Sequence, residues 1–346
     1  MGMWERIKGT EARPVFKAAV VGEGPEAERL ASAYELAAGV ETVGAEIVQH
    51  ADGVVRAPVV RPAALPSFET IIRTPGLRAV EIVAPAERRA ELAAAAIKAG
   101  LFTSVDAPSG LDELMEMERL AGAYDVPLRI RLLPLYYPPY QEMRRLAKEE
   151  AVGRPMALKL LTRRGRGTDL PAGLDPGQWI SDHELGFIAL APWLLGPIEK
   201  VYARLDRQNG QSSPPSALIM WKYSGLHQYG HLQVDFCPGL HVRTFTEPVH
   251  RFIELTCVGG IIMATRGEGQ LLRMPALIAR GKSTTTSFEM VPDDWREVYK
   301  NLARETVKVL SGGAVPLSTP ALCAEAIRLV RSARMSAQQG DEARFQ

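Results

Sequence analysis

Two glycines near the N-terminus carry the clearest chemical signal of the sequence. Gly22, Gly24 and Ala27 have the spacing G-x-G-x-x-A, between an apolar run and an amphipathic segment. In that setting the glycines allow a tight strand-to-helix turn, and the helix N-terminus attracts a pyrophosphate. The motif therefore predicts a dinucleotide cofactor, NAD or NADP, with its pyrophosphate over residues 22–27.

The residues between the glycines oppose tight binding. Glu23 and Glu26 place negative charge where a diphosphate would lie, and Pro25 lacks the N–H that it would donate. Glu46 is the acid best placed to bind ribose hydroxyls, which favours NAD over NADP. The alternatives are a turn retained for packing alone and, for Glu46, a solvated carboxylate at a strand end. We therefore expect any dinucleotide to bind weakly.

Two side chains are candidates for acid–base chemistry. His183 lies between Asp182 and Glu184, and a neutral imidazole that titrates near pH 6.5 suits proton transfer. Its alternative interpretation is an exposed histidine in a loop or at a helix start. Tyr137, in an aromatic and proline-rich stretch, is the second candidate, although such a stretch at a domain junction also serves packing.

Arg163, Arg164 and Arg166 form the only compact basic cluster of the sequence. Guanidinium groups bind carboxylate or phosphate through two parallel hydrogen bonds. The cluster predicts an anionic substrate, and a solvated loop is the alternative.

Histidines in the second half raise the question of a metal. His227 and His231 share one face of a strand expected at residues 226–236, about 13 Å apart at roughly 3.3 Å per residue. They are too far apart to bind one metal directly, and His241 or His250 would have to complete a site. We assign no metal ligand, and a polar subunit interface is the alternative.

The segments around the glycine motif alternate apolar runs with amphipathic helices, which is typical of βαβ units and a parallel sheet. Strands are expected at residues 15–21, 41–49, 79–84, 101–105 and 128–133, and helices at residues 26–36, 86–99 and 111–124. Residues 1–133 are therefore predicted to form an α/β dinucleotide-binding domain of the Rossmann type.

After the prolines at 134, 138 and 139 the pattern changes to consecutive strands joined by short turns. Strands are expected at residues 156–162, 201–205, 217–223, 226–236, 241–246, 252–257 and 261–265, and helices at residues 140–150, 293–310 and 320–333. This order predicts an α+β domain at residues 134–346, with a large, open, mostly antiparallel sheet and helices on one face. The strand at 226–236 has no plainly polar or apolar face, which favours a homo-oligomer through the open sheet.

Composition excludes several classes. With 346 residues, 46% hydrophobic and 23% charged, the chain is too apolar for disorder. The 41 basic and 40 acidic residues give a net charge of +1, which disfavours nucleic-acid binding. Three scattered cysteines argue against a disulfide framework, and no stretch predicts a membrane span. We expect a cytoplasmic protein that acts on a small molecule.

The order of these elements resembles the Gfo/Idh/MocA family of glucose-fructose oxidoreductases and inositol dehydrogenases. The resemblance covers nearly the whole chain and rests on short pieces in the family's order, at residues 20–34, 39–41, 80–85, 95–100, 105–108, 138–140, 152–155 and 193–196. It implies a Rossmann domain, a second domain with an open sheet, nicotinamide cofactors, sugar-like or other small substrates, and oligomers. It also adds Pro85 and Asp106 to the cofactor-binding residues.

The same resemblance shows where family residues are missing. The family's catalytic lysine, in an E-K-P motif, corresponds to Ala107 between Asp106 and Pro108. Counting back from Trp193 places Gly186 at the family's histidine and Ala189 at its aspartate. Neither a methyl group nor a glycine can transfer a proton.

Three functions therefore compete. The first is a divergent NAD(P)-dependent oxidoreductase that uses a substitute acid–base group, His183 or Tyr137, on a small, anionic or sugar-like metabolite. The second is a non-redox enzyme on the same scaffold, such as a lyase, decarboxylase or isomerase, with or without metal assistance. The third is a non-catalytic ligand-binding protein.

Overall fold

The computed structural model describes residues 16–22, 24–37, 40–42, 68–108, 110–165, 175–207, 215–225, 227–237, 239–244, 248–271 and 273–345. The described residues fall into two compact units. The first comprises the chain up to Pro108, together with Met115–Ile130 and Tyr299–Leu317, and the second comprises Ser109–Leu114, Arg131–Val298 and the chain from Ser318 onward.

The first unit is built on a five-stranded sheet in the order β2-β1-β3-β4-β5. Its strands are β1 (Phe16–Gly22), β2 (Val40–Thr42), β3 (Leu77–Val83), β4 (Phe102–Asp106) and β5 (Leu128–Arg131). The pairings β1–β2, β1–β3 and β3–β4 are parallel. In β1 the side chains of residues 18–21 are all buried, as expected for a parallel sheet covered on both faces.

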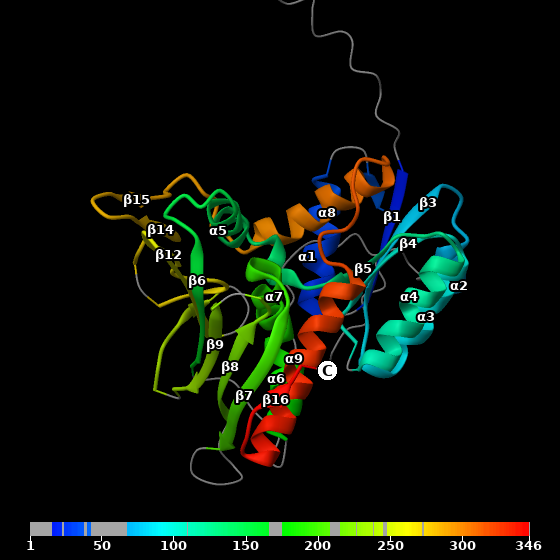
Figure 1. Ribbon diagram of the computed structural model, residues 1–346. Coiled ribbons are helices and arrows are strands. Elements are labelled where there is room, and N and C mark those ends of the chain that lie inside the picture. Colours follow the sequence, from blue (N-terminus) through cyan, green and yellow to red (C-terminus); the bar gives the residue numbers. More distant parts are fainter. Residues whose placement is uncertain are drawn as a thin grey trace, which may run out of the picture. The chain divides into compact units, whose positions relative to one another are not determined.

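The helices of this unit lie on both faces of its sheet, with α3 and α4 on one face and α1 and α8 on the other (Figure 1). They are α1 (Gly24–Glu35), α2 (Phe68–Ile72), α3 (Ala86–Lys98), α4 (Leu111–Ala123) and α8 (Arg296–Leu310). The predicted doubly wound α/β fold is confirmed. Gly100, which follows α3, has φ +75°, the left-handed conformation typical of a residue that ends a helix.

The second unit contains a nine-stranded sheet in the order β15-β14-β12-β11-β6-β9-β8-β7-β16. Its strands are β6 (Pro155–Arg164), β7 (Ile198–Arg207), β8 (Pro215–Tyr223), β9 (Tyr229–Phe236), β11 (Val249–Cys257), β12 (Gly260–Ala264), β14 (Leu277–Arg280), β15 (Thr285–Ser287) and β16 (Ala343–Arg344). Only β6 and β9 pair in parallel among the described strands of this sheet. The predicted large, mostly antiparallel sheet is therefore confirmed.

Helices cover one face of this sheet. They are the short 3-10 helix η1 (Leu133–Tyr136), α5 (Pro138–Lys148), α6 (Pro176–Ile188), α7 (Leu190–Leu195) and α9 (Pro320–Gln339). Along β8, Ala217, Ile219 and Trp221 are buried, whereas Leu218 and Met220 alternate with them and are exposed. We call the exposed side the outer face.

Two sequence expectations differ from the structure. Within the described part of the strand expected at residues 241–246, β10 (Arg243–Thr244) pairs with β13 (Gly269–Gln270) in a separate sheet and not with the large sheet. Most of the second unit follows residue 130, near the expected division at 133, but residues 299–317 return to the first unit. A single division at residue 133 does not account for this return. Two side chains of α8 bond to β5 and α1, because Glu305 accepts a hydrogen bond from Arg129 and the hydroxyl of Thr306 bonds to that of Tyr34.

Helix α6 was not among the expected helices, although the residues at its start carry a local signal for a helix N-terminus. Asp175 caps the helix by accepting a hydrogen bond from the backbone N–H of Gln178 at 2.8 Å, and Pro176 stands in its first turn. No helix within the described residues is long and apolar enough to cross a membrane.

Candidate functional site

The glycine motif lies where the strand order of the first sheet reverses, between β1 and β3. Gly22 ends β1 with φ +156°, and a Cβ atom built there would lie 2.1 Å from the carbonyl oxygen of Val83. No side chain fits in that space, so the close approach of β1 and β3 requires glycine. In open α/β sheets, ligands bind outside the carboxyl ends of the strands at such a reversal.

Helix α1 begins directly beyond this point. Gly24 has φ +79°, and no described atom lies within 4 Å of the position its Cβ would take. Ala27 is fully buried against the sheet, while Glu26 is half-buried in the first turn. Backbone N–H groups of a first turn have no partner within the helix, so the turn can bind an anion, although Pro25 contributes no donor.

The other predicted cofactor residues lie at the same edge of the sheet. Pro85 immediately precedes α3 and is exposed, two residues beyond the end of β3. Asp106 is the last residue of β4 and is half-buried. The structure thus brings Gly22, Pro85 and Asp106 to the carboxyl ends of three neighbouring strands. Glu23 and Glu46 lie outside the described residues.

Ala107 follows β4 at this edge. Its carbonyl oxygen accepts a hydrogen bond from Nη1 of Arg89, a half-buried residue of α3. A guanidinium therefore lies beside the position where the family resemblance implies a lysine.

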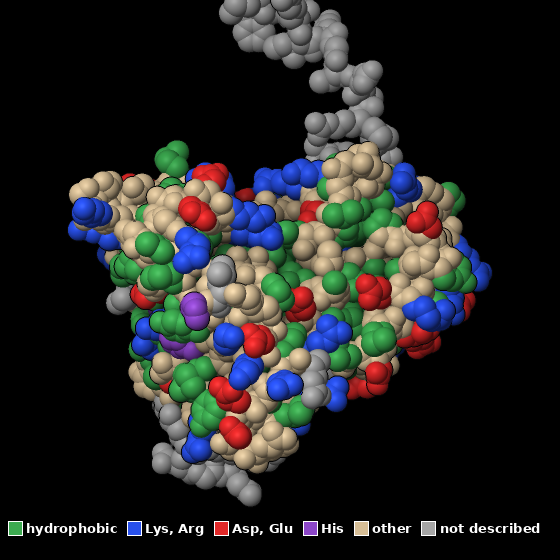
Figure 2. Space-filling view, in the orientation of Figure 1, with side chains coloured by type: hydrophobic (Ala, Val, Ile, Leu, Met, Phe, Trp, Pro, Cys, Tyr) green, Lys and Arg blue, Asp and Glu red, His purple; other side chains and the backbone are tan. Residues whose placement is uncertain are grey.

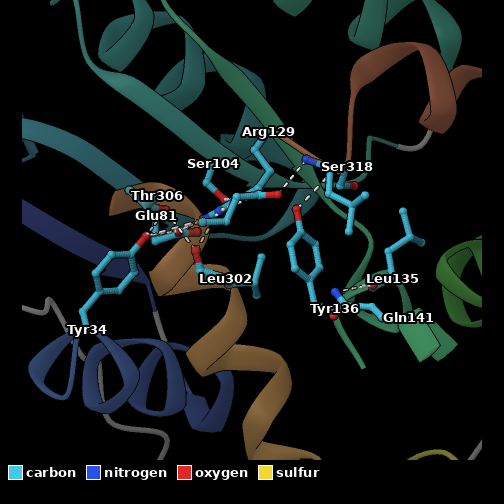
Figure 3. Close-up of polar contacts among 12 residues, drawn as sticks. Tyr34, Glu81, Ser104, Arg129, Leu135, Tyr136, Gln141, Leu302, Thr306 and Ser318 are labelled. Atoms are coloured by element: carbon cyan, nitrogen blue, oxygen red, sulfur yellow. Dashed lines mark hydrogen bonds and ion pairs between the residues drawn. The ribbon is translucent and has the colours of Figure 1, made fainter. Parts of the chain in front are cut away.

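A buried polar network lies within the same unit (Figure 3). The guanidinium of Arg129 pairs through Nη2 with Glu81, and Nη1 lies 3.2 Å from Oε2 of Glu305. Its Nε donates to the hydroxyl of Ser104 at 3.0 Å, and Nη1 also donates to the carbonyl of Leu302 at 3.0 Å. The network joins β3, β4 and β5 to α8.

The phenol of Tyr34 completes this network from α1. Its hydroxyl donates to Oε1 of Glu81 at 2.6 Å and lies 2.6 Å from the hydroxyl of Thr306. Burial raises the pKa of Tyr34 well above its ordinary value, and the neighbouring Glu81 carboxylate adds to the rise. The phenol is therefore a neutral donor that holds α1 to β3 and α8.

In the second unit, the predicted arginine cluster is divided by the alternation of β6. Arg164 points to the helix-covered side and is buried, whereas Arg163 lies on the outer face, paired in register with Asp235 and His250. Successive residues of a strand point to opposite faces, so Arg163 and Arg164 cannot bind one ligand together. Arg166 lies outside the described residues.

Glu184 of α6 is the centre of a second buried network. Nη2 of Arg164 lies 2.9 Å from Oε1 of Glu184, and Nη2 of Arg251 lies 3.5 Å from Oε2. The hydroxyl of Thr162 also donates to Oε2 at 2.9 Å. Burial alone would raise the pKa of the Glu184 carboxyl, but the two guanidiniums and these hydrogen bonds outweigh it and hold the pKa below the ordinary value.

His183 is neither in a loop nor at a helix start. It lies within α6 and is half-buried, with its ring stacked on the indole of Trp179 at a centroid distance of 5.1 Å. Nδ1 lies 3.0 Å from the carbonyl oxygen of Trp179. A carbonyl only accepts, so Nδ1 carries the proton and Nε2 of the neutral ring carries a lone pair, as a general base requires.

Gly186 and Ala189, the positions that the family resemblance assigns to a histidine and an aspartate, have little space for a larger side chain. A Cβ atom on Gly186 would lie 3.0 Å from Cδ of Pro134, at η1. Ala189 is fully buried at the end of α6. A larger side chain at Gly186 would require Pro134 to move.

Tyr137 is fully buried, and its hydroxyl donates to the carbonyl oxygen of Asp293 at 3.1 Å. Burial raises its pKa well above the ordinary value, so the phenol is neutral. Trp295 packs against it at 5.2 Å between ring centroids. Behind this contact, Trp295 and Asp293 border a surface hollow of about 380 Å³ that also contains Arg266 and Glu268.

The histidines considered for a metal site, at 227, 231, 241 and 250, do not gather into a metal centre. His231 and His250 lie on different strands that β6 separates, and His227 and His241 are exposed. Among the residues that the structure describes, no three histidine, cysteine or acidic side chains could hold one metal ion.

Sequence reasoning missed the network around Glu184. The local signals were present: residues 162 and 164 share a strand face, and residues 179 and 183 lie four apart on a helix. Arg251, which completes the network from β11, gave no such signal, because strand pairing alone brings it to Glu184.

No protein-family model matches the sequence, and no curated protein is similar to it. Solved structures are similar in fold. An oxidoreductase from Agrobacterium radiobacter, in complex with NAD+, L-tartaric acid and magnesium, aligns over 95% of this chain and 98% of its own, with a TM-score of 0.74 and 16% identity.

Two inositol dehydrogenase structures are similar in the same way. A putative myo-inositol dehydrogenase from Sinorhizobium meliloti aligns over 96% of this chain and 100% of its own, with a TM-score of 0.74 and 13% identity. The myo-inositol 2-dehydrogenase from Lactobacillus plantarum aligns over the same shares, with a TM-score of 0.72 and 15% identity. The chain therefore has the fold of these two-domain oxidoreductases.

Proposed function

We propose that this protein is an NAD(P)-dependent oxidoreductase of a small hydroxylated metabolite. The observation that carries the proposal is the close contact between Gly22 and Val83, which excludes a side chain at residue 22. The backbone there is therefore not covered by a side chain, at the point where the strand order reverses and α1 begins. The similar fold of an oxidoreductase solved with NAD+ supports the same cofactor.

The residues present fit a dinucleotide. Gly24 has open space where a side chain would stand, so a pyrophosphate can approach the backbone of α1. Gly22, Gly24 and Ala27 would hold the pyrophosphate, with Pro85 and Asp106 along the same edge. When bound, the nicotinamide supplies the acceptor or donor of a hydride.

We assign the accompanying proton transfer to His183. The bond from its Nδ1 to the Trp179 carbonyl leaves Nε2 able to accept the proton of a substrate hydroxyl. Ala107 and Gly186 stand where the family resemblance implies the lysine and histidine, so the proposed site uses a substitute group. Arg163, Arg164 and Arg166 cannot act as one anion clamp, since β6 directs the first two to opposite faces.

Dinucleotide binding tests the cofactor assignment. Gly24→Ala adds a methyl group where the pyrophosphate approaches, and we expect it to weaken NADH or NADPH affinity by about tenfold or more. Gly100→Ala is the matched control, because Gly100 has nearly the same φ, +75°, and equally open surroundings. It follows the C-terminal end of α3, away from the edge where the dinucleotide would bind. Both variants should lose similar stability. Absence of dinucleotide binding to the unmodified protein would favour a non-redox or ligand-binding function.

Turnover tests the role of His183. His183→Gln should slow dinucleotide reduction about 100- to 10,000-fold without changing dinucleotide affinity, since a positioned acid–base group is lost. His227→Gln is the control, because His227 is exposed. The measurement is NADH formation over a panel of polyols and hydroxy acids. Unchanged turnover would remove His183 from the mechanism.

We also propose that the outer face forms a homo-oligomer interface. Met220 and Tyr229 are 39% and 60% exposed there, and strand register places Met220 between Tyr202 and His231. Figure 2 shows histidine among hydrophobic and charged side chains on the second unit. Met220→Lys should lower the mass measured by light scattering toward the 37.8 kDa monomer. Met290→Lys, at a 95% exposed position away from these strands, should leave it unchanged.

A further inference from the structure

Arg89 is a guanidinium at the ligand-binding edge of the first unit, and no carboxylate among the described residues forms an ion pair with it. It projects from the first turn of α3, directly after Pro85, and its Nη1 donates to the carbonyl of Ala107 at the end of β4. It is half-buried. Within the described part of the chain no ion pair joins Arg89 to an acidic side chain, and its buried Nε has no hydrogen-bond partner.

An unneutralised, half-buried cation is costly, and an anion that reaches it relieves the cost. The bond to Ala107 also holds the guanidinium in one place, because the carbonyl fixes one of its two amino groups. Such a fixed fork favours a planar anion such as a carboxylate, which accepts two parallel hydrogen bonds.

The strand order indicates which part of a ligand Arg89 would meet. β2 and β4 lie on opposite sides of the β1–β3 pair. A dinucleotide with its pyrophosphate at Gly22–Ala27 directs its adenosine ribose toward the end of the second strand, and its nicotinamide the other way, toward β3 and β4. Arg89 is therefore on the nicotinamide side, where a substrate is oxidised or reduced.

We propose that Arg89 binds a carboxylate of the substrate, so that the protein acts on hydroxy acids rather than on uncharged polyols. The proposal rests on the proposed function for its cofactor. It adds a positively charged group at the end of β4, supplied by α3 rather than by residue 107.

Matched pairs of a carboxylate and its alcohol test this specificity. Calorimetry of the full chain with saturating NAD+ compares D-glycerate with glycerol, D-gluconate with sorbitol, and galactarate with galactitol. We expect at least one carboxylate to bind tenfold or more tightly than its alcohol. Arg89→Gln should remove about 10- to 100-fold of that affinity, and Arg89→Lys, which keeps the charge but not the fork, should retain part of it.

Arg88→Gln is the control on the same helix, because Arg88 is exposed, and it should keep the full preference. The proposal is overturned if no carboxylate is preferred, or if Arg89→Gln keeps the preference. It is also overturned if Arg89→Gln weakens NADH itself as much as the acid, since Arg89 would then hold the cofactor. Failure of the unmodified protein to bind NADH defeats the proposed function instead, and the same acid and alcohol pairs without NAD+ then decide on Arg89.

Discussion

Each unit contains a buried ionic network among its described residues, and the two networks have opposite arrangements of charge. In the first, a single guanidinium, Arg129, stands between the carboxylates of Glu81 and Glu305. In the second, a single carboxylate, Glu184, stands between the guanidiniums of Arg164 and Arg251. Both central side chains are completely buried.

Their surroundings also differ. The first network is closed by hydroxyl and carbonyl groups of its own unit, and no residue proposed for catalysis belongs to it. The second is continuous with the candidate base, because Arg251 donates to the carbonyl of His183 at 3.2 Å and Arg164 lies over the ring of Trp179 at 4.9 Å. The comparison shows that similar burial serves a scaffold in one unit and holds a proposed catalytic helix in the other.

Removing either centre should have the largest effect on stability. Arg129→Met leaves two carboxylates facing each other, and Glu184→Gln leaves two guanidiniums, so each should cost about 3–5 kcal/mol of unfolding free energy. Urea unfolding followed by tryptophan fluorescence reports mainly the second unit, which contains four of the five tryptophans, Trp179, Trp193, Trp221 and Trp295. Hydrogen exchange in β3 and β5 reports the first.

The control for these variants is Glu116→Gln, which removes a fully exposed ion pair with Arg119 and should change neither transition. The comparison fails if either central variant unfolds at the same urea concentration as this control.

Acid should also weaken the second network. The loss of unfolding free energy should be smaller than for the central substitutions, because protonation keeps the side chain of Glu184 in place. Its pKa is lower in the folded protein, so its charge stabilises the fold above the unfolded value, near pH 4.3, and this stabilisation is lost as pH falls through the folded pKa. The difference in unfolding free energy between unmodified protein and Glu184→Gln should be largest at neutral pH and shrink below about pH 4. A constant difference would show that folding does not lower the pKa of Glu184.

Removing the hydroxyl groups that complete each network should cause the next largest losses of unfolding free energy. Tyr34→Phe removes a group with two partners at 2.6 Å and should cost about 1–3 kcal/mol. Thr162→Val removes a single bond to Glu184, at 2.9 Å, and should cost about 1 kcal/mol. Equal losses in thermal or urea unfolding would mean that the second bond of Tyr34 contributes nothing.

The outer carboxylates should matter least. Glu305 pairs with the central Arg129, and Glu268 pairs with Nη1 of Arg251, one of the two guanidiniums beside Glu184. Glu305→Gln leaves Arg129 paired with Glu81, and Glu268→Gln leaves Arg251 paired with Glu184, so each should cost about 0.5–1.5 kcal/mol. Both side chains are 13% exposed, which makes them a matched pair across the two units. A much larger loss for Glu268→Gln would mean that Arg251 depends on it more than on Glu184.

The fold class follows from local pattern. The apolar run of β1, Gly22 and the helical repeat after Gly24 predict a strand, a tight turn and a helix, because each depends on neighbours in the sequence. The alternation along β9 likewise places Tyr229, His231 and Gln233 on the less buried face. Even the separation of Arg163 from Arg164 follows from the period of a strand.

Other features depend on residues far apart in the chain. Glu81 interrupts an apolar strand, and its burial is explained by partners far away in the sequence, Arg129 and Tyr34, which lie 48 and 47 residues from it. The sequence by itself determined most of the helices and strands and the glycine turn, because these depend on local pattern. Tertiary structure decided which charges are paired, that α8 joins the first unit, and that Arg89 lies at the end of β4. Periodicity reports which face of an element is buried, whereas ion pairing depends on which distant elements pack together.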